Sequence, residues 1–153
     1  MAAADAAGAA GGARRAQRDA RRLCLESIFE ADFGQRTAER VLERHLGDEQ
    51  PGPATASLAG LLVAVVTRHR DTLDAEIERV APAYPVVQLA RIDRALLRCG
   101  MGELLHCPAT PTRVAISEWV ELARTYSGEP ARRLLNGVLG RVAREALGAS
   151  GPE

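Results

Sequence analysis

The stretch 111–147, PTRVAISEWVELARTYSGEPARRLLNGVLGRVAREAL, decides the fold class of this chain. Its apolar residues recur every three or four positions, which is the period of an α-helix that buries one face. Ser127-Gly128 interrupts this pattern, and Pro130 then lies where the first turn of a helix tolerates proline. The stretch therefore predicts two consecutive amphipathic helices, over residues 112–126 and about 131–147.

The dipeptide Asn136-Gly137 in this stretch is elsewhere typical of a β-hairpin turn. Here the residues on both sides of it keep a helical period and not the alternation of a strand. The sequence therefore favours an uninterrupted helix, with Gly137 as a point of close packing.

The same periodicity extends toward the N-terminus, where Gly- and Pro-rich loops separate the apolar segments. It predicts further helices over residues 14–33, around 41–46, over about 54–81 and over 92–106. Gly100 and Gly102 within the last of these cost about 1 kcal/mol each relative to alanine unless close packing requires them. With six or seven helices and no credible strand, the chain is predicted to be a single all-α domain over residues 14–147.

Length and composition agree with this prediction and suggest where the protein works. The 153 residues fit one domain, and the low aromatic content of 3% suits packed helices better than a β-sandwich. No run approaches the roughly 20 apolar residues of a membrane span. Residues 1–13 are Ala/Gly-rich without the features of a secretory signal, so we expect a disordered tail there and a short C-terminal tail over 148–153. A soluble cytoplasmic protein is predicted.

No cofactor, metal site or catalytic centre is expected. The three cysteines, Cys24, Cys99 and Cys107, form no CxxC pair and are interpreted as buried free thiols. His45, His69 and His106 lie in separate predicted elements, and only His69 lies on an apolar stripe. Carboxylates that share a helix face have arginine neighbours, which favours salt-bridged surfaces over a catalytic pair.

The arginines carry the functional information. All 20 basic residues are arginine and net charge is zero, so attraction to nucleic acid must come from local clustering. Five arginines and one acid fall within residues 14–22: Arg14, Arg15, Arg18, Arg21 and Arg22, with Asp19. On a helix several of them share one face, which could meet successive RNA phosphates. Such cations oppose the macrodipole of a helix that starts at Arg14, a local cost that hints at a partner. A solvated helix start in an arginine-rich proteome is the alternative.

Several motifs resemble the NusB family, over about residues 14–147. Arg91-Ile92-Asp93-Arg94-Ala95-Leu96-Leu97-Arg98 followed by Glu103-Leu104-Leu105 is similar to its "VDRAILR…ELL" signature. Residues 111–123, PTRVAISEWVELA, resemble "PxxVAINEAVELAK", and residues 135–140, LNGVLG, resemble "VNGVLD". Residues 20–22 and 27–32 resemble the basic opening helix of the family and its "ALYxxD" continuation.

This resemblance implies an all-α fold of two packed helical subdomains and a non-enzymatic transcription antitermination factor. It implies that the protein binds boxA-type single-stranded RNA together with NusE, a small-subunit ribosomal protein, in an RNA polymerase antitermination complex on ribosomal RNA operons. By position, Arg14, Arg15, Arg18, Arg21 and Arg22 correspond to the RNA-binding region. Phe29 and Asp93 correspond to partner-facing residues, and Tyr126 to a base-stacking ring or, alternatively, a core or rim aromatic.

Two departures from the family pattern bear on this interpretation. Glu129-Pro130-Ala131 replaces an acidic-Ser stretch that contributes to RNA binding in the family, with Leu134 in place of its usual phenylalanine. Trp119 replaces a usual alanine, so either the neighbouring helix is displaced or the ring is partly exposed at an interface. A second class of function therefore stays open: a helical interaction module or homodimer, through the Trp119 helix or the opening helix, with little RNA affinity of its own.

Overall fold

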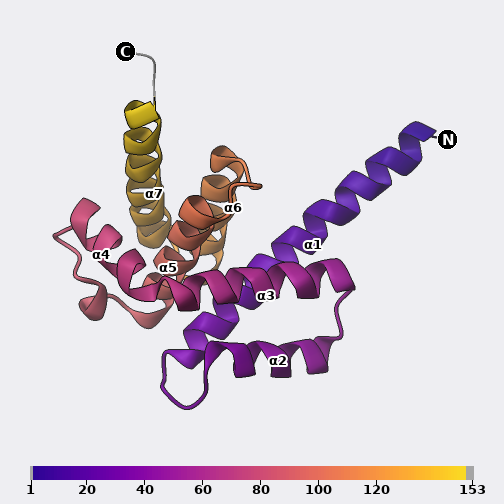
Figure 1. Ribbon diagram of the computed structural model, residues 1–153, viewed down its shortest axis with the longest axis horizontal. Coiled ribbons are helices and arrows are strands. Elements are labelled where there is room, and N and C mark those ends of the chain that lie inside the picture. Colours follow the sequence, from indigo (N-terminus) through magenta and orange to yellow (C-terminus); the bar gives the residue numbers. More distant parts are fainter. Residues whose placement is uncertain (1, 151–153) are drawn as a thin grey trace. The chain divides into compact units, whose positions relative to one another are not determined.

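The computed structural model describes residues 2–150, with side chains from Gly8 to Ala146. Its elements are α1 (Ala2–Ala31), α2 (Ala38–Glu49), α3 (Pro53–Arg68), α4 (Arg70–Val80), a 3-10 turn η1 (Val86–Gln88), α5 (Arg91–His106), α6 (Thr112–Tyr126) and α7 (Glu129–Ser150) (Figure 1). Residues 2–150 contain no strand, so the all-α prediction is confirmed. None of the described helices is long and apolar enough for a bilayer crossing.

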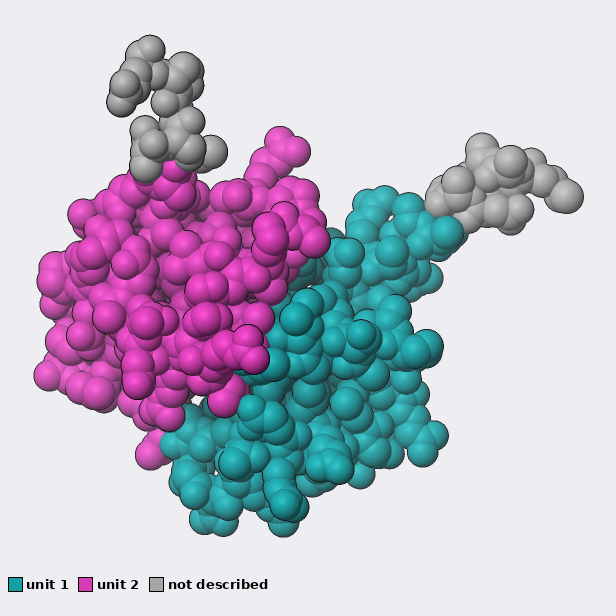
Figure 2. Space-filling view, viewed as in Figure 1, with its two compact units in different colours: residues 1–64 teal, residues 65–153 magenta. Residues whose placement is uncertain are grey.

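The chain divides into two compact units, residues 1–64 and 65–153, with the boundary inside α3 (Figure 2). In the first unit, α1 packs against α2. Buried residues on α1 recur at helical spacing, and α2 is capped at its N-terminus by Thr37, whose hydroxyl accepts a hydrogen bond from the backbone N–H of Arg40. The chain leaves α1 through Gly34, whose φ of +81° favours glycine.

The second unit is built around α5, which packs against α4, α6 and α7. Every residue from Ala95 to Glu103 is buried, including two charged side chains. Arg98 donates to both carboxylate oxygens of Asp74 on α4, at 2.8 and 3.0 Å. Glu103 accepts a hydrogen bond of 2.7 Å from the indole Nε1 of Trp119. The middle of α5, which is buried on all sides, tolerates these charges because each has a partner.

Glycine makes room for the large ring on α6. A Cβ at Gly100 would lie 3.3 Å from Trp119 Cβ and 3.0 Å from Leu139 Cδ1, and a Cβ at Gly102 would lie 3.1 Å from Val66 Cγ2. Close packing therefore explains both glycines. Trp119 is 0% exposed, so its ring is not at an interface. The Gly100 backbone is what admits the tryptophan.

Several predicted boundaries are wrong. The helix predicted over 54–81 is two helices separated at His69, whose φ of −104° and ψ of 14° leave the helical range. The Thr72 hydroxyl donates to the His69 carbonyl, a local bond that competes with continuous helix. Apolar spacing does not register a one-residue break of this kind. Gly137 is not a close-packing point either, because nothing lies within 4 Å of a Cβ built there.

The predicted tails also differ from the structure. Residues 2–13, expected to be disordered, form the beginning of α1, and α7 continues to Ser150; residues 1 and 151–153 lie outside the described residues. Alanine has the highest helix propensity, and no proline interrupts the first segment, which outweighs its glycines. The three cysteines are free and buried, as predicted.

Candidate nucleic-acid and partner interfaces

The arginine cluster lies well inside α1, and its members differ in exposure. Arg14, Arg15 and Arg18 are exposed, and Arg14 and Arg18 are one turn apart on the same side of the helix. Because α1 begins at Ala2, these cations are more than three turns from its N-terminus. The macrodipole falls off within the first turn, so the predicted local cost of placing arginines there does not apply.

Arg21 does not belong to the exposed set, contrary to the prediction from the sequence. It is 2% exposed and lies between buried residues of α1, next to Ala20 and two positions before Leu23. A guanidinium in this position cannot be reached by an RNA phosphate. Arg21 therefore belongs to the structural face of the helix.

Arg22 is held by carboxylates. Its guanidinium donates to Glu49 of α2 at 2.7 and 3.4 Å and to Glu26, one turn further along α1, at 3.1 Å; Asp19 lies 3.7 Å away. The hydrogen bond from Arg22 lowers the pKa of the Glu49 carboxyl. Arg22 therefore links α1 to α2, and its charge is already neutralised within the first unit.

His45 completes this group of charges. Its Nδ1 lies 3.9 Å from Glu49, and its Nε2 is buried without a hydrogen-bond partner. Among the described side chains, only Glu26, His45 and Glu49 bring three potential metal ligands together, with their ligand atoms within 4.8 Å of one another. Because the Arg22 guanidinium already binds both carboxylates, an ion-pair network accounts for this cluster.

The structure brings two other histidines together that the sequence kept apart. The rings of His69 and His106 stack with centroids 3.7 Å apart. Burial lowers the pKa of His106, and the neighbouring His69 lowers it further. His69 lies at the break between α3 and α4, and His106 at the end of α5. No periodicity in the sequence could pair them.

Phe29, predicted to face a partner, is half-buried on α1. Its ring stacks on Phe33 with centroids 5.3 Å apart, and Phe33 is 52% exposed. The pair presents apolar surface at the C-terminal end of α1. Aromatic surface of this kind is enriched where proteins bind one another.

Tyr126 lies near Asp93 because the residue that caps α6 after Tyr126 forms a hydrogen bond with Asp93. Tyr126 ends α6 and is 37% exposed. The next residue, Ser127, donates a hydrogen bond of 2.6 Å from its hydroxyl to Asp93 on α5. The chain then turns through Gly128 with φ +110°, a conformation that favours glycine. The predicted RNA-stacking ring and the predicted partner residue therefore lie at one corner of the second unit.

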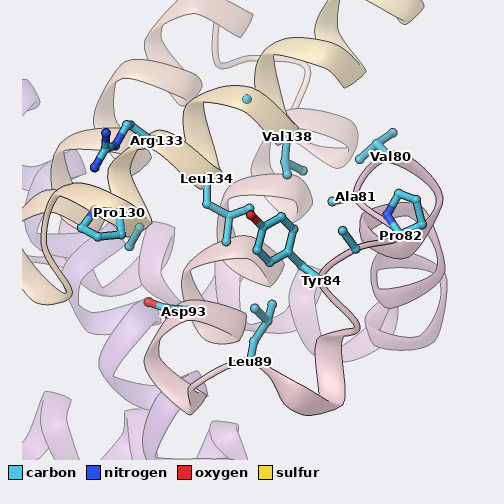
Figure 3. Close-up of a pocket in the computed structure, with 13 residues that line it drawn as sticks. Val80, Ala81, Pro82, Tyr84, Leu89, Asp93, Pro130, Arg133, Leu134 and Val138 are labelled. Atoms are coloured by element: carbon cyan, nitrogen blue, oxygen red, sulfur yellow. The ribbon is translucent and has the colours of Figure 1, made fainter.

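Asp93 also lines a pocket of about 740 Å³ that no sequence pattern predicted. The loop from Ala81 to Tyr84, Leu89 of the following segment and the first turns of α7 form its walls. Figure 3 shows Tyr84 and Leu134 in the middle of the pocket, with Asp93 and Arg133 toward one side. Tyr84 is 51% exposed. The sequence feature that could have indicated this apolar pocket is the aromatic residue between Pro82 and Pro85.

The fold and these surfaces define the class of the protein: a small all-helical protein with two compact units, a basic face on its first helix and an apolar pocket beside an aspartate. The sequence pattern of the NusB family matches residues 18–144. The chain belongs to the NusB family.

Relatives of known family align with this chain along most of their length. A transcription antitermination protein NusB from Dehalococcoides mccartyi is 38% identical over 128 residues, covering 84% of this chain and 90% of that protein. One from Salinispora arenicola is 39% identical over 132 residues, covering 86% and 97%. The solved NusB of T. maritima superposes with a TM-score of 0.79 at 28% identity, covering 84% of this chain and 91% of that one. A chain in a crystal structure of antitermination factors NusB and NusE with double-stranded RNA has a TM-score of 0.78 at 21% identity, covering 86% and 98%, and shows the shared fold.

Proposed function

We propose that this protein is a non-enzymatic transcription antitermination factor that binds boxA-type single-stranded RNA together with NusE, within an RNA polymerase antitermination complex. The family and the names of its relatives support this function. The observation that carries the RNA part is the exposure of Arg14, Arg15 and Arg18 along one segment of α1. The proposal implies a cytoplasmic protein without a cofactor.

The RNA-binding face consists of these three arginines, with Tyr126 as a separate stacking contact. Exposed guanidiniums bind phosphates in pairs of hydrogen bonds and release counterions when they do so. An exposed aromatic ring can stack on an unpaired base. Arg21 and Arg22 support this face without contacting RNA, since one is buried and the other is bound by Glu26 and Glu49.

NusE is proposed to contact two separate patches, one at Phe29 in the first unit and one at Asp93 in the second unit. Apolar surface lies beside each: Phe33 stacks on Phe29, and Tyr84 and Leu134 share a pocket with Asp93. The related complex that holds NusB, NusE and RNA supports the choice of partner.

The alternative of a homodimer through the Trp119 helix or the opening helix is not tested by the burial of the Trp119 ring, which removes only that side chain from the possible contacts. A homodimer through either helix stays a prediction. Light scattering of the protein alone and with NusE measures it directly.

A titration of labelled RNA with and without NusE tests the proposed function. We compare a boxA-type single strand, a single strand of scrambled sequence and a duplex of the boxA sequence, because the related complex contains double-stranded RNA. The single-stranded boxA RNA should bind more tightly than both others, and NusE should strengthen that binding. Equal affinity for all three RNAs with NusE present would contradict the proposal.

A further inference from the structure

A second hollow in the 65–153 unit lies between α6 and α7 and is separate from the Asp93 pocket. Its volume is about 630 Å³, and it shares no lining residue with that pocket. On α7 the two sets fall on different faces: Arg133 and Gly137 line the Asp93 pocket, whereas Asn136 and Gly140 line this groove. None of the surfaces proposed above uses it.

The groove has the length of a short helix. Its lining runs from Thr112 to Glu121 on α6 and from Arg132 to Arg144 on α7. At 1.5 Å per residue these segments span about 14 and 18 Å, or roughly three helical turns. Asn136 and Gly140 leave space on the α7 side of the groove. A groove between two packed helices accepts the ridge of side chains of a third helix.

The floor of the groove is apolar and only partly covered. On α6, Ala115, Trp119 and Ala123 are buried, whereas Ile116 and Val120, which line the groove, are only half-buried. α6 thus has a second apolar stripe beside the one that packs into the unit. Burying such a stripe is the usual contribution of an amphipathic helix that binds in a groove.

The residues that line the groove carry a net positive charge. Three arginines line it, Arg113, Arg132 and Arg144, against one acid, Glu121. Glu129 binds Arg132 at 2.8 Å, and Arg124 binds Glu121. Within the part of the chain that the structure describes, Arg113 and Arg144 have no such partner. Both lie far from the α6–α7 turn, so one end of the groove carries two available positive charges.

We propose that this groove docks an acidic amphipathic helix of a partner protein. Small or branched apolar side chains at positions i, i+3, i+4 and i+7 of that helix pack on Ile116 and Val120. Acidic side chains at one end of it meet Arg113 and Arg144. Opposite charge fixes the direction of the bound helix more than it adds affinity.

Single-stranded RNA is the competing occupant, and the groove suits it less well. Binding of a single strand combines cations with aromatic rings on which bases stack. The described lining has no aromatic residue, and its floor is aliphatic. RNA is nevertheless kept as an explicit outcome of the test.

The test uses the full-length ¹⁵N-labelled protein and two synthetic 16-residue helical peptides. Both carry leucine and alanine in the i, i+3, i+4, i+7 pattern; one has glutamate at its flanking positions and the other has lysine. The glutamate peptide should shift the amide resonances of residues 113–121 and 136–144 and bind at least about tenfold more tightly than the lysine peptide. Millimolar glutamate peptide that leaves these resonances unchanged, or equal binding of the two peptides, would overturn the proposal.

Charge reversal at the rim provides the control. R113E/R144E should invert the preference so that the lysine peptide binds more tightly, while R36E/R40E, which reverses two exposed arginines elsewhere, should leave it unchanged. G140L, which fills the groove without changing its charge, should abolish binding of both peptides, and thermal unfolding verifies that each variant is folded. If boxA-type RNA shifts the same amides and R113E/R144E weakens RNA binding more than R36E/R40E does, the groove is a nucleic-acid site and the proposal is wrong.

Discussion

The two ends of the arginine cluster in α1 behave differently, although they are only about two turns apart. Arg14, Arg15 and Arg18 are exposed, whereas Arg21 is buried and Arg22 is bound by Glu26 and Glu49. Arginine is thus proposed to bind RNA at the N-terminal end of the cluster, and it stabilises the fold at the C-terminal end. Which role an arginine takes depends on what packs around it, and charge density along the sequence does not report that.

The largest expected difference between the two ends is in stability. Arg21→Ala should lower the free energy of unfolding by roughly 2–4 kcal/mol, because it removes a buried side chain and the packing of its stem. Arg14→Ala should change it by less than about 0.5 kcal/mol, as for ordinary surface substitutions. Urea unfolding followed by circular dichroism measures both. Equal effects of the two substitutions would remove the distinction between the ends.

A smaller effect is expected for the ion pairs that tie α1 to α2. Arg22→Gln should lower the free energy of unfolding by about 0.5–1 kcal/mol, since Glu49 is 38% exposed and solvent screens the pair. The matched variant Arg15→Gln removes the same charge from the exposed end and should have no measurable effect. A stabilising effect of Arg22→Gln would show that the carboxylates do not hold Arg22 in solution.

The smallest expected effect is the pH dependence of the stability that the ion pair between Arg22 and Glu49 contributes. Hydrogen bonding to Arg22 lowers the pKa of Glu49 below its ordinary value of 4.5. A lowered carboxyl pKa contributes stability above pH 4.5, and this contribution is lost as pH falls from 4.5 through the folded-state pKa. The stability difference between the parent and Arg22→Gln should therefore be constant above about pH 6 and shrink below pH 4.5. Thermal unfolding from pH 7 to pH 3 measures it, and a difference that grows in acid would contradict the assignment.

Periodicity was enough to predict much of the fold. Where one apolar stripe faces a core and the loops contain Gly or Pro, the first and last residues of a helix can be predicted closely from the sequence. The helix predicted over 112–126 is observed over those residues. The break at His69 escaped prediction because the apolar spacing continues across it while the backbone does not. The sequence left the burial of Trp119 open, because it depends on Gly100 lying opposite the ring, a contact between residues far apart in the sequence.

The candidate sites were less predictable than the fold. The cluster in residues 14–22 could be found from charge alone, but the burial of Arg21 and the pairing of Arg22 with Glu49 depend on how α1 packs with α2. The hydrogen bond between Asp93 and Ser127 joins α5 to the residue that follows α6. Interactions of this kind appear only when the helices are assembled.

The salt dependence of RNA affinity tests the division of the arginine cluster most directly. Binding of boxA-type RNA is measured between 50 and 300 mM salt for the parent, R14Q/R15Q/R18Q, the charge-matched control R36Q/R40Q/R70Q and Arg21→Met. The slope of log affinity against log salt should become shallower by roughly 2 in the first variant, because each phosphate that is no longer neutralised reduces it by about 0.7. The control and Arg21→Met should keep the parent slope. A parent slope in R14Q/R15Q/R18Q, or an equally shallow slope in the control, would contradict this division of the cluster.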